Sequence, residues 1–269
     1  MEKVKFKAIE GNRISLDGGS MFGNAPKSVW SKWEKPDSQN RIELACRCLL
    51  VQTGEKNILF EAGTGAFFDP KMKERFCIES NHVLLDNLGL KPEKIDAVIL
   101  SHLHFDHAGG ILPVFGEKER IVFPNATIYV SQEHFEYAKS PHPRERASFI
   151  PKIQETLVKS GQLQLLKKGE VPALGIDLDF TYSDGHTRAM MLPSIGPLLF
   201  ASDLIPGRSW VHLPITMGYD RFSEKKVDEK FALYKEGQMI FFTHDPKVAF
   251  AKLNKNERGR WHASPCEVI

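Results

Sequence analysis

Short apolar runs bounded by polar and turn residues recur along the chain, and their length is typical of strands. The clearest run is Ile95 to Leu100, which is rich in β-branched residues and predicts a buried strand. Loose alternation of apolar and polar residues within 1–18 predicts a hairpin that leads to two glycines. Comparable runs predict further strands at 42–51, 56–60, 121–123, 126–130, 176–182, 198–203 and 239–244.

Apolar residues at helical spacing are less frequent along the chain. Val227, Phe231 and Tyr234 recur at helical spacing, with Ser223 as a helix cap and Gly237 as the stop. Helices are also predicted at 80–88, 132–138 and in a segment ending near residue 159, and a helix or turn at 67–76. The stretch 252–260 predicts a surface helix or loop. The long irregular segment 20–40 contains aromatic residues and is either a lip over an active site or a packed loop or dimer contact.

The most informative stretch follows directly on the predicted strand Ile95 to Leu100. His102, His104, Asp106 and His107 fall within six positions and precede Ala-Gly-Gly. A tight turn at a strand end lets side chains converge on one point instead of alternating across a sheet. Imidazole nitrogens and carboxylate oxygens are ligands that zinc, iron and manganese accept. The cluster therefore predicts a metal site, against the alternative of a histidine-rich polar loop.

Matching donors occur downstream, each where an apolar run stops. His186 follows the run 176–182, Asp203 ends the run 198–203, and His244 ends the run 239–244. Taken singly, either histidine could be a core or turn residue. Because four strand ends all carry metal-ligand side chains, we expect them to meet at one edge of a sheet sandwich.

This series of donors resembles the metallo-β-lactamase-fold hydrolases, whose motifs are His-x-His-x-Asp-His, a Gly-His-Thr-type histidine, an aspartate and a final histidine. All seven positions of the binuclear form have a match, and the resemblance covers nearly the whole chain. It implies an α+β fold, a four-layer αββα sandwich, in a single domain over residues 1–269. It also implies two divalent metal ions, zinc foremost with iron or manganese as alternatives. By this resemblance His102, His104 and His186 hold one ion, Asp106, His107 and His244 hold the other, and Asp203 bridges both.

Several further stretches resemble the branch of quorum-quenching lactonases that act on N-acyl homoserine lactones: residues 17–23, 61–68, 203–206 and 217–220. The β-lactamases usually carry Cys at the bridging position, whereas Asp203 is typical of lactonase, glyoxalase-II-like and nuclease branches. The chain departs from the lactonases at Pro206, where they have a tyrosine that handles the leaving group. Tyr219 is the candidate to do this from another loop, with a structural tyrosine as the alternative.

Smaller features carry further expectations. Glu61 stands where many family members have Asp-x-Gly, which suggests a role behind the metal ligands. Arg188 follows the Gly-His-Thr motif in place of proline, so the path of that loop is expected to differ. Asp245 either orients a neighbouring ligand or forms an Asp-Pro turn. His134 and His142 are expected to be exposed structural residues.

The ligand set predicts a mechanism. Two cations about 3.5–4 Å apart share a water, lower its pKa toward ~7 and hold it as a bridging hydroxide near a carbonyl carbon. Asp106 would orient this hydroxide or carry its proton to the leaving group. The predicted function is hydrolysis of a lactone or ester. The alternatives are hydrolysis of a thioester, β-lactam or phosphodiester on the same metals, and a metal-containing binding module without turnover.

Composition narrows the partners. The 269 residues include 36 basic and 34 acidic side chains, a balance that argues against a nucleic-acid surface. Of the four cysteines, Cys46 and Cys48 are predicted to be core hydrophobes. The start lacks the apolar region of a signal peptide, and no apolar run reaches the ~18 residues of a membrane span. We expect a cytoplasmic protein with a small-molecule substrate and no membrane partner; a homodimer stays open.

Overall fold

Two six-stranded sheets form the centre of the molecule, which the computed structural model describes from residue 4 to residue 267. In spatial order, the first sheet consists of β1 (Lys5–Ile9), β4 (Cys48–Gln52), β5 (Asn57–Phe60), β6 (Ala97–Ile99), β7 (Thr127–Ser131) and β8 (Leu163–Leu166). The second consists of β14 (Trp261–Pro265), β13 (Phe250–Lys255), β12 (Met239–Phe241), β11 (Leu198–Phe200), β10 (Met190–Ile195) and β9 (Leu178–Ser183). A separate pair is formed by β2 (Ile14–Asp17) and β3 (Arg41–Leu44).

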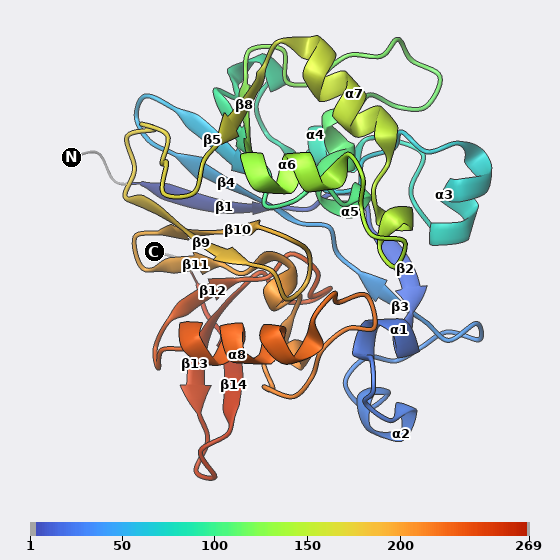
Figure 1. Cartoon of the computed structure of the whole chain (residues 1–269), viewed down its shortest axis with the longest axis vertical. Coiled ribbons are helices and arrows are strands. Elements are labelled where there is room, and N and C mark those ends of the chain that lie inside the picture. Colours follow the sequence, from blue (N-terminus) through green and yellow to red (C-terminus); the bar gives the residue numbers. More distant parts are fainter. Residues whose placement is uncertain (1–3, 268–269) are drawn as a thin grey trace.

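Helices cover the outer faces of both sheets, which gives four layers (Figure 1). The first sheet is covered by α4 (Val83–Asn87), α6 (Gln132–Ala138) and α7 (Pro151–Ser160), and the second by α8 (Ser223–Leu233). The shorter helices are α1 (Gly18–Phe22), α2 (Lys27–Trp30), α3 (Pro70–Phe76) and α5 (Phe105–Ala108). Single 3₁₀ turns occur at Pro92–Lys94, Gly109–Ile111, Arg146–Ser148, Ser202–Leu204 and Arg208–Trp210. The predicted αββα sandwich is confirmed.

Within residues 4–267, no helix has the length and apolar character needed to cross a membrane.

Alternate residues of the central strands face the two sides of the first sheet. In β5, Ile58 and Phe60 belong to the core between the two sheets, while Leu59 belongs to the core beneath the helices. All three are completely buried, because both faces of the strand are covered. Across the interface, the ring of Phe60 lies 6.0 Å from that of Phe200, between ring centroids. The sheets are thus held together by apolar burial on their inner faces.

The order of parallel strands brings the predicted donors to one end of the sandwich. In the first sheet β5, β6, β7 and β8 run parallel, and in the second β11 runs parallel to β12. The carboxyl ends of parallel neighbours meet at the same edge of a sheet. The segments after β6, β11 and β12 carry His102, Asp203 and His244, and the segment after β9 carries His186.

The hairpin predicted within residues 1–18 is wrong. β1 pairs with β4 in the first sheet, whereas β2 pairs with β3 in the small sheet. The single strand predicted at 42–51 is likewise divided into β3 and β4. The break falls where the backbone amides of Ala45 and Arg47 donate to the carbonyls of His244 and Thr243, far along the chain. Alternation in the sequence predicted extended chain correctly but carried no information on the pairing partner.

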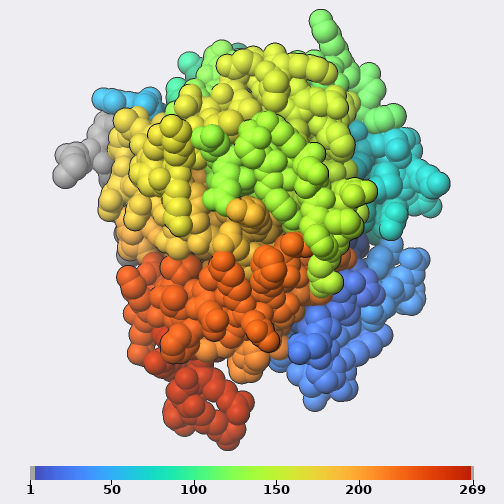
Figure 2. Space-filling model, viewed as in Figure 1, coloured from blue at the N-terminus to red at the C-terminus, as the bar shows by residue number. Residues whose placement is uncertain are grey.

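Two other local predictions are wrong, the first of them only in part. The stretch 252–260, predicted as a surface helix or loop, consists of the last four residues of β13 and the exposed turn that joins β13 to β14. This hairpin projects from the body of the molecule (Figures 1 and 2). The run 121–123 is not a strand, and its three side chains are buried in the core beneath the helices. A short apolar run indicates burial more reliably than it indicates a strand.

The segment 20–40 is packed rather than open. Phe22 stacks on Trp30 at 5.4 Å and on Trp210 at 4.6 Å between ring centroids, and all three rings are buried. The indole nitrogen of Trp210 donates to the carbonyl of Met21 at 2.8 Å. The Met21 side chain also lines the cavity described below. The segment therefore serves both as a packed element and as part of a cavity wall.

Candidate metal centre

The histidine-rich stretch turns sharply after β6 because close backbone contacts hold it from two sides. A Cβ atom at Gly110 would lie 1.9 Å from the carbonyl oxygen of Ala62, so this close approach requires glycine. From the other side, the amide of Leu103 donates to Nε2 of His134 at 2.9 Å. His104 then directly precedes the short helix α5, which carries Asp106, His107 and their neighbours inward.

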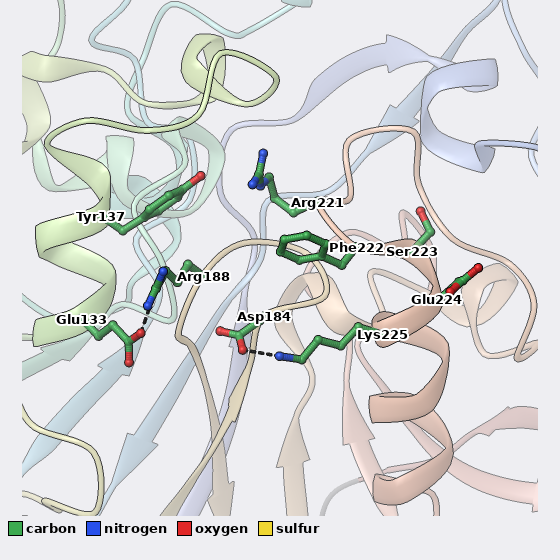
Figure 3. Close-up of a pocket in the computed structure, with 9 residues that line it drawn as sticks. All are labelled: Glu133, Tyr137, Asp184, Arg188, Arg221, Phe222, Ser223, Glu224 and Lys225. Atoms are coloured by element: carbon green, nitrogen blue, oxygen red, sulfur yellow. Dashed lines mark hydrogen bonds and ion pairs between the residues drawn. The ribbon is translucent and has the colours of Figure 1, made fainter.

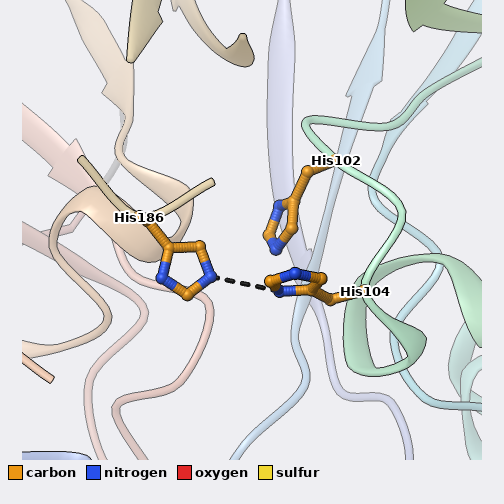
Figure 4. Close-up of side chains that lie close together, drawn as sticks. All are labelled: His102, His104 and His186. Carbon is orange, nitrogen blue, oxygen red and sulfur yellow. Dashed lines mark hydrogen bonds between the residues drawn. The ribbon is translucent and has the colours of Figure 1, made fainter. Parts of the chain in front are cut away.

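Three histidines from distant parts of the chain form the first group of donors. Donor atoms of His102, His104 and His186 all lie within 4.8 Å of one another, and all three side chains are buried. Their rings converge, with Nε2 of His186 3.1 Å from Nδ1 of His104 (Figure 4). Nε2 of His102 is buried without a hydrogen-bond partner among residues 4–267. Converging imidazole nitrogens with an unsatisfied member fit a divalent cation.

A second group lies beside the first. Donor atoms of Asp106, His107 and His244 also lie within 4.8 Å of one another. The two Nε2 atoms of the histidines are 3.1 Å apart, and Oδ2 of Asp106 is 3.6 Å from Nε2 of His244. Two nitrogens and a carboxylate oxygen again make a set that zinc, iron or manganese accepts.

Asp203 lies between the two groups. Its Oδ1 is 3.3 Å from Nε2 of His107 and 3.1 Å from Nε2 of His244, while its Oδ2 is 3.2 Å from Nε2 of His186. One carboxylate oxygen thus faces each group. The structure brings together all seven predicted donors, which are His102, His104, Asp106, His107, His186, Asp203 and His244.

The electrostatics of the centre depend on this carboxylate. Burial and the neighbouring histidines lower the pKa of His102 well below its usual value. Burial also acts to lower the pKa of His107, but the carboxylates of Asp203 and Asp106 outweigh it and raise this pKa to about 10. Burial acts to raise the pKa of Asp203, and the surrounding imidazoles instead hold it well below its usual value. Ligands must lose their protons to bind a cation, so metal binding here releases protons.

Most of the ring nitrogens that face away from the centre have a partner. Nδ1 of His186 is 2.8 Å from Oδ1 of Asp220, and Nδ1 of His244 is 2.6 Å from the carbonyl of Ala45. Nδ1 of His102 is 2.8 Å from the hydroxyl of Ser101. Such partners fix the tautomer and orientation of metal-binding histidines.

Two glutamates face the remaining outer nitrogens. Oε1 of Glu61 lies 3.5 Å from Nδ1 of His107, and Oε2 of Glu145 lies 3.4 Å from Nε2 of His104. Both glutamates are buried. Glu61 therefore lies behind a predicted ligand, where the sequence placed it. Glu145 was not predicted, since nothing in its sequence neighbourhood marks it as different from a surface residue.

Other residues behind the centre were also missed. His134, expected to be exposed, is fully buried, and its Nδ1 lies 2.7 Å from the carbonyl of Arg188, next to the His186 loop. Burial lowers the pKa of His134 to about 4. The ring is therefore a neutral link between the backbones on either side of the first group. His142 is exposed, as predicted.

Helix α8 buries only part of the predicted face: Tyr234, just after its end, is buried and Val227 is half-buried, but Phe231 is exposed. Phe231 is 67 % exposed, whereas Lys226 and Lys230 are completely buried. Nζ of Lys226 donates to Oδ1 of Asp220 at 2.8 Å, the same oxygen that faces His186. Nζ of Lys230 donates to the backbone carbonyls of Trp210 and Ile215. Hydrophobic spacing could not predict the burial of the two lysines, because polar partners brought close by the fold satisfy them.

The structure also decides between the alternatives for Asp245 and locates two of the cysteines. The carboxylate of Asp245 accepts from the amides of Lys247 and Val248 and from Arg208, and it contacts none of the predicted ligands. The turn alternative is thus the one observed. Cys46 and Cys48 are buried, as predicted.

A cavity of about 180 Å³ opens onto both groups. Tyr219, proposed from the sequence as a catalytic residue, lies in its wall, and the residue is 37 % exposed. Burial raises the pKa of Tyr219, so its hydroxyl stays protonated at neutral pH. The lining residues are mostly apolar around the polar centre: Leu16, Met21, Leu44, Arg75, Phe76, His104, Phe105, Asp106, Ala147, Ser148, His186, Asp203, Met217, Tyr219 and His244.

The layered fold and the histidine–aspartate centre together define a metal-dependent hydrolase. Residues 41–236 match the metallo-β-lactamase superfamily, and the chain belongs to that superfamily. An N-acyl homoserine lactonase from Bacillus cereus is 26 % identical over 230 residues, which are 77 % of this chain and 83 % of the relative.

Solved structures show the same fold. A probable metal-dependent hydrolase from Staphylococcus aureus is 23 % identical, with a TM-score of 0.85, over 100 % of this chain and 99 % of that one. AidC, a dizinc quorum-quenching lactonase in complex with a product, is 20 % identical, with a TM-score of 0.75, over 100 % of this chain and 96 % of that one. At these identities the likeness establishes the fold alone.

Replacing Asp203 with Ala tests the arrangement of the donors. The variant is expected to hold at least one metal ion fewer per chain than the wild type, because it removes the carboxylate that faces both groups. Metal content is measured by plasma mass spectrometry after dialysis against zinc. Asp228→Ala, which changes an exposed aspartate on α8, is the control and should leave the metal content unchanged. Equal metal content in the Asp203 variant and the wild type would refute a bridging position.

Proposed function

We propose that this protein is a binuclear metal-dependent hydrolase that opens a lactone or ester, with N-acyl homoserine lactones as the favoured substrate class. The observation that carries the proposal is the position of Asp203, which directs one oxygen to each donor group. A carboxylate in this position suits two cations held side by side. Zinc is the first choice of metal, since nitrogen and carboxylate ligands suit it, and iron or manganese are the alternatives.

The donors divide into two sites in this proposal. His102, His104 and His186 hold one ion, Asp106, His107 and His244 hold the other, and Asp203 contacts both. When bound, two such ions supply Lewis acidity and a water that is activated at neutral pH. No serine or cysteine nucleophile is then needed.

Asp106 has a second role in the proposed reaction. Its carboxylate is 12 % exposed and lines the cavity, whereas the histidines around it are almost fully buried. It is therefore placed to orient the attacking water and to carry a proton from it to the leaving alkoxide. Proton transfer by a positioned carboxylate of this kind typically contributes about 10²–10⁴-fold to a rate.

The cavity favours an acyl substrate. Leu16, Met21, Leu44, Phe76 and Met217 give it apolar walls that suit an acyl chain. Arg75 is the single Lys or Arg side chain among its lining residues, whereas binding to a phosphate backbone calls for clustered basic residues. The relatives named N-acyl homoserine lactonases support the same substrate class for this chain.

Tyr219 is proposed to act on the leaving group. The lactonases have a tyrosine shortly after the bridging aspartate, and this chain has Pro206 there, which carries no hydroxyl. The carbonyl of Pro206 accepts a hydrogen bond from the amide of His244. Tyr219 brings a protonated hydroxyl to the same cavity from a different loop. Its hydroxyl would donate a hydrogen bond to the oxygen that becomes negative as the ester bond breaks.

A substrate panel tests the proposed activity. Zinc-loaded protein is expected to hydrolyse homoserine lactones of several acyl lengths and a simple aryl ester, and to lose this activity when the metal is removed by a chelator. Hydrolysis of a thioester, a β-lactam and a phosphodiester is measured in parallel. Activity confined to one of these three substrates would sink the lactonase proposal while leaving the metal-dependent hydrolase in place.

Tyr219→Phe tests the leaving-group role. The variant should lower kcat by about tenfold to hundredfold with little change in KM, because a hydrogen bond to a charged oxygen is worth about 1.5–3 kcal/mol. Steady-state kinetics on the best lactone measure both constants, and the metal content serves as the control. A kcat equal to that of the wild type would show that Tyr219 is a structural residue.

A further inference from the structure

The segment 145–149 contacts the ring of His104 on the side opposite the other donors. The backbones of His104 and Phe149 form an isolated antiparallel bridge, and their rings meet edge to face at 4.6 Å between centroids. Glu145 of the same segment places Oε2 3.4 Å from Nε2 of His104. Because Nδ1 of His104 faces His186, the ring is contacted at both nitrogens and on its side.

Glu145 is itself held in place. Its carboxylate is buried, and Oε1 accepts from the hydroxyl of Tyr137 and lies 3.2 Å from Nε of Arg221. Among residues 4–267, Oε2 of Glu145 and Nε2 of His104 have no hydrogen-bond partner other than each other, and they lie 3.4 Å apart. A buried carboxylate fixed on one oxygen by two donors leaves its other oxygen directed at the imidazole.

The two residues that hold Glu145 line a surface cleft. Tyr137 from α6 and Arg221, just before α8, face each other across a cleft of about 710 Å³ (Figure 3). Four other charged side chains of the cleft are paired in exposed bridges, Glu133 with Arg188 and Lys225 with Asp184. Glu145 therefore connects this cleft to the metal centre through a single side chain.

We infer that Glu145 is a positioning residue that accepts a hydrogen bond from Nε2 of His104, keeps Nδ1 free for the metal ion, and so sets the affinity of the first metal site. This inference rests on the proposed function, because it takes His104 as a ligand. Asp220 occupies the equivalent place behind His186, at 2.8 Å. Carboxylate partners of this kind orient metal-binding histidines and raise their basicity.

Glu145→Gln separates this role from simple packing. The amide matches the shape of the carboxylate, but it has one acceptor oxygen in place of two. If that oxygen remains with Tyr137 and Arg221, the amide presents N–H groups to a ring nitrogen that must itself donate. The substitution thus opposes the tautomer of His104 that binds metal while it preserves the volume of the side chain.

The experiment measures zinc affinity by competition with a chromophoric chelator. Glu145→Gln is expected to weaken one of the two zinc sites roughly 10–100-fold, the usual effect of removing such a partner, and to leave the other site much less changed. Glu145→Asp keeps the charge and should recover part of the loss. The matched control is Glu133→Gln in the same cleft, which removes an exposed bridge to Arg188 and should bind zinc as the wild type does.

A spectroscopic signature provides a second readout. In the zinc-loaded wild type, the hydrogen-bonded N–H of the His104 ring should give a downfield proton resonance that exchanges slowly with water. This resonance should be lost in Glu145→Gln and retained in Glu133→Gln. A purely structural role for Glu145 would lower the melting temperature of the variant without changing zinc affinity or this resonance.

The outcomes are distinguishable. If the wild type binds no zinc, both the proposed function and the inference about Glu145 are overturned. If the wild type binds zinc and Glu145→Gln binds it equally tightly, the inference alone is overturned. Should Glu145→Gln fail to fold, Tyr137→Phe serves in its place, since it removes one of the donors that hold the carboxylate. This variant should weaken zinc binding in the same direction by a smaller factor, and unchanged affinity would overturn the inference.

Discussion

The carboxylate of Asp203, buried between two groups of donor side chains, balances the charge of the site. Its two oxygens lie within 3.3 Å of nitrogens from both groups. Leaving a buried charge without its partner costs about 3–5 kcal/mol. A cluster of ionisable side chains such as this one can be buried only if opposite charges satisfy it. Divalent cations satisfy donors of these types.

The fold supplies this arrangement in two steps. Parallel strands in each sheet carry their carboxyl ends to the same edge, so donors more than a hundred residues apart in the sequence meet there. A set of side chains behind the candidate ligands then holds them in place. Glu61, Glu145 and Asp220 face the outer nitrogens of three histidines, and buried Lys226 balances the last of these carboxylates. The cavity can therefore be mostly apolar around the donors, because their charges are balanced by the side chains behind them.

The resemblance to the metallo-β-lactamase family implied the αββα fold. The sequence also marked seven candidate donors that the structure brings together, because each combines a distinctive residue type with the end of an apolar run. It could not predict strand partners, as the division of β1 and β2 between two sheets shows, since alternation is a local property. It also missed Glu145 and the buried face of α8. These residues are charged, and their burial is decided by partners brought close only by the fold, such as Arg221 for Glu145 and Asp220 for Lys226. The single domain, the cytoplasmic location and the oligomeric state remain predictions.

The most direct measurement of the central claim is anomalous X-ray diffraction from zinc-loaded crystals, with data collected on both sides of the zinc absorption edge. We expect two anomalous peaks about 3.5–4 Å apart, the usual separation in two-metal sites. One peak should lie against His102, His104 and His186, the other against Asp106, His107 and His244, with Asp203 between them. A single peak, or peaks away from these side chains, would contradict the account.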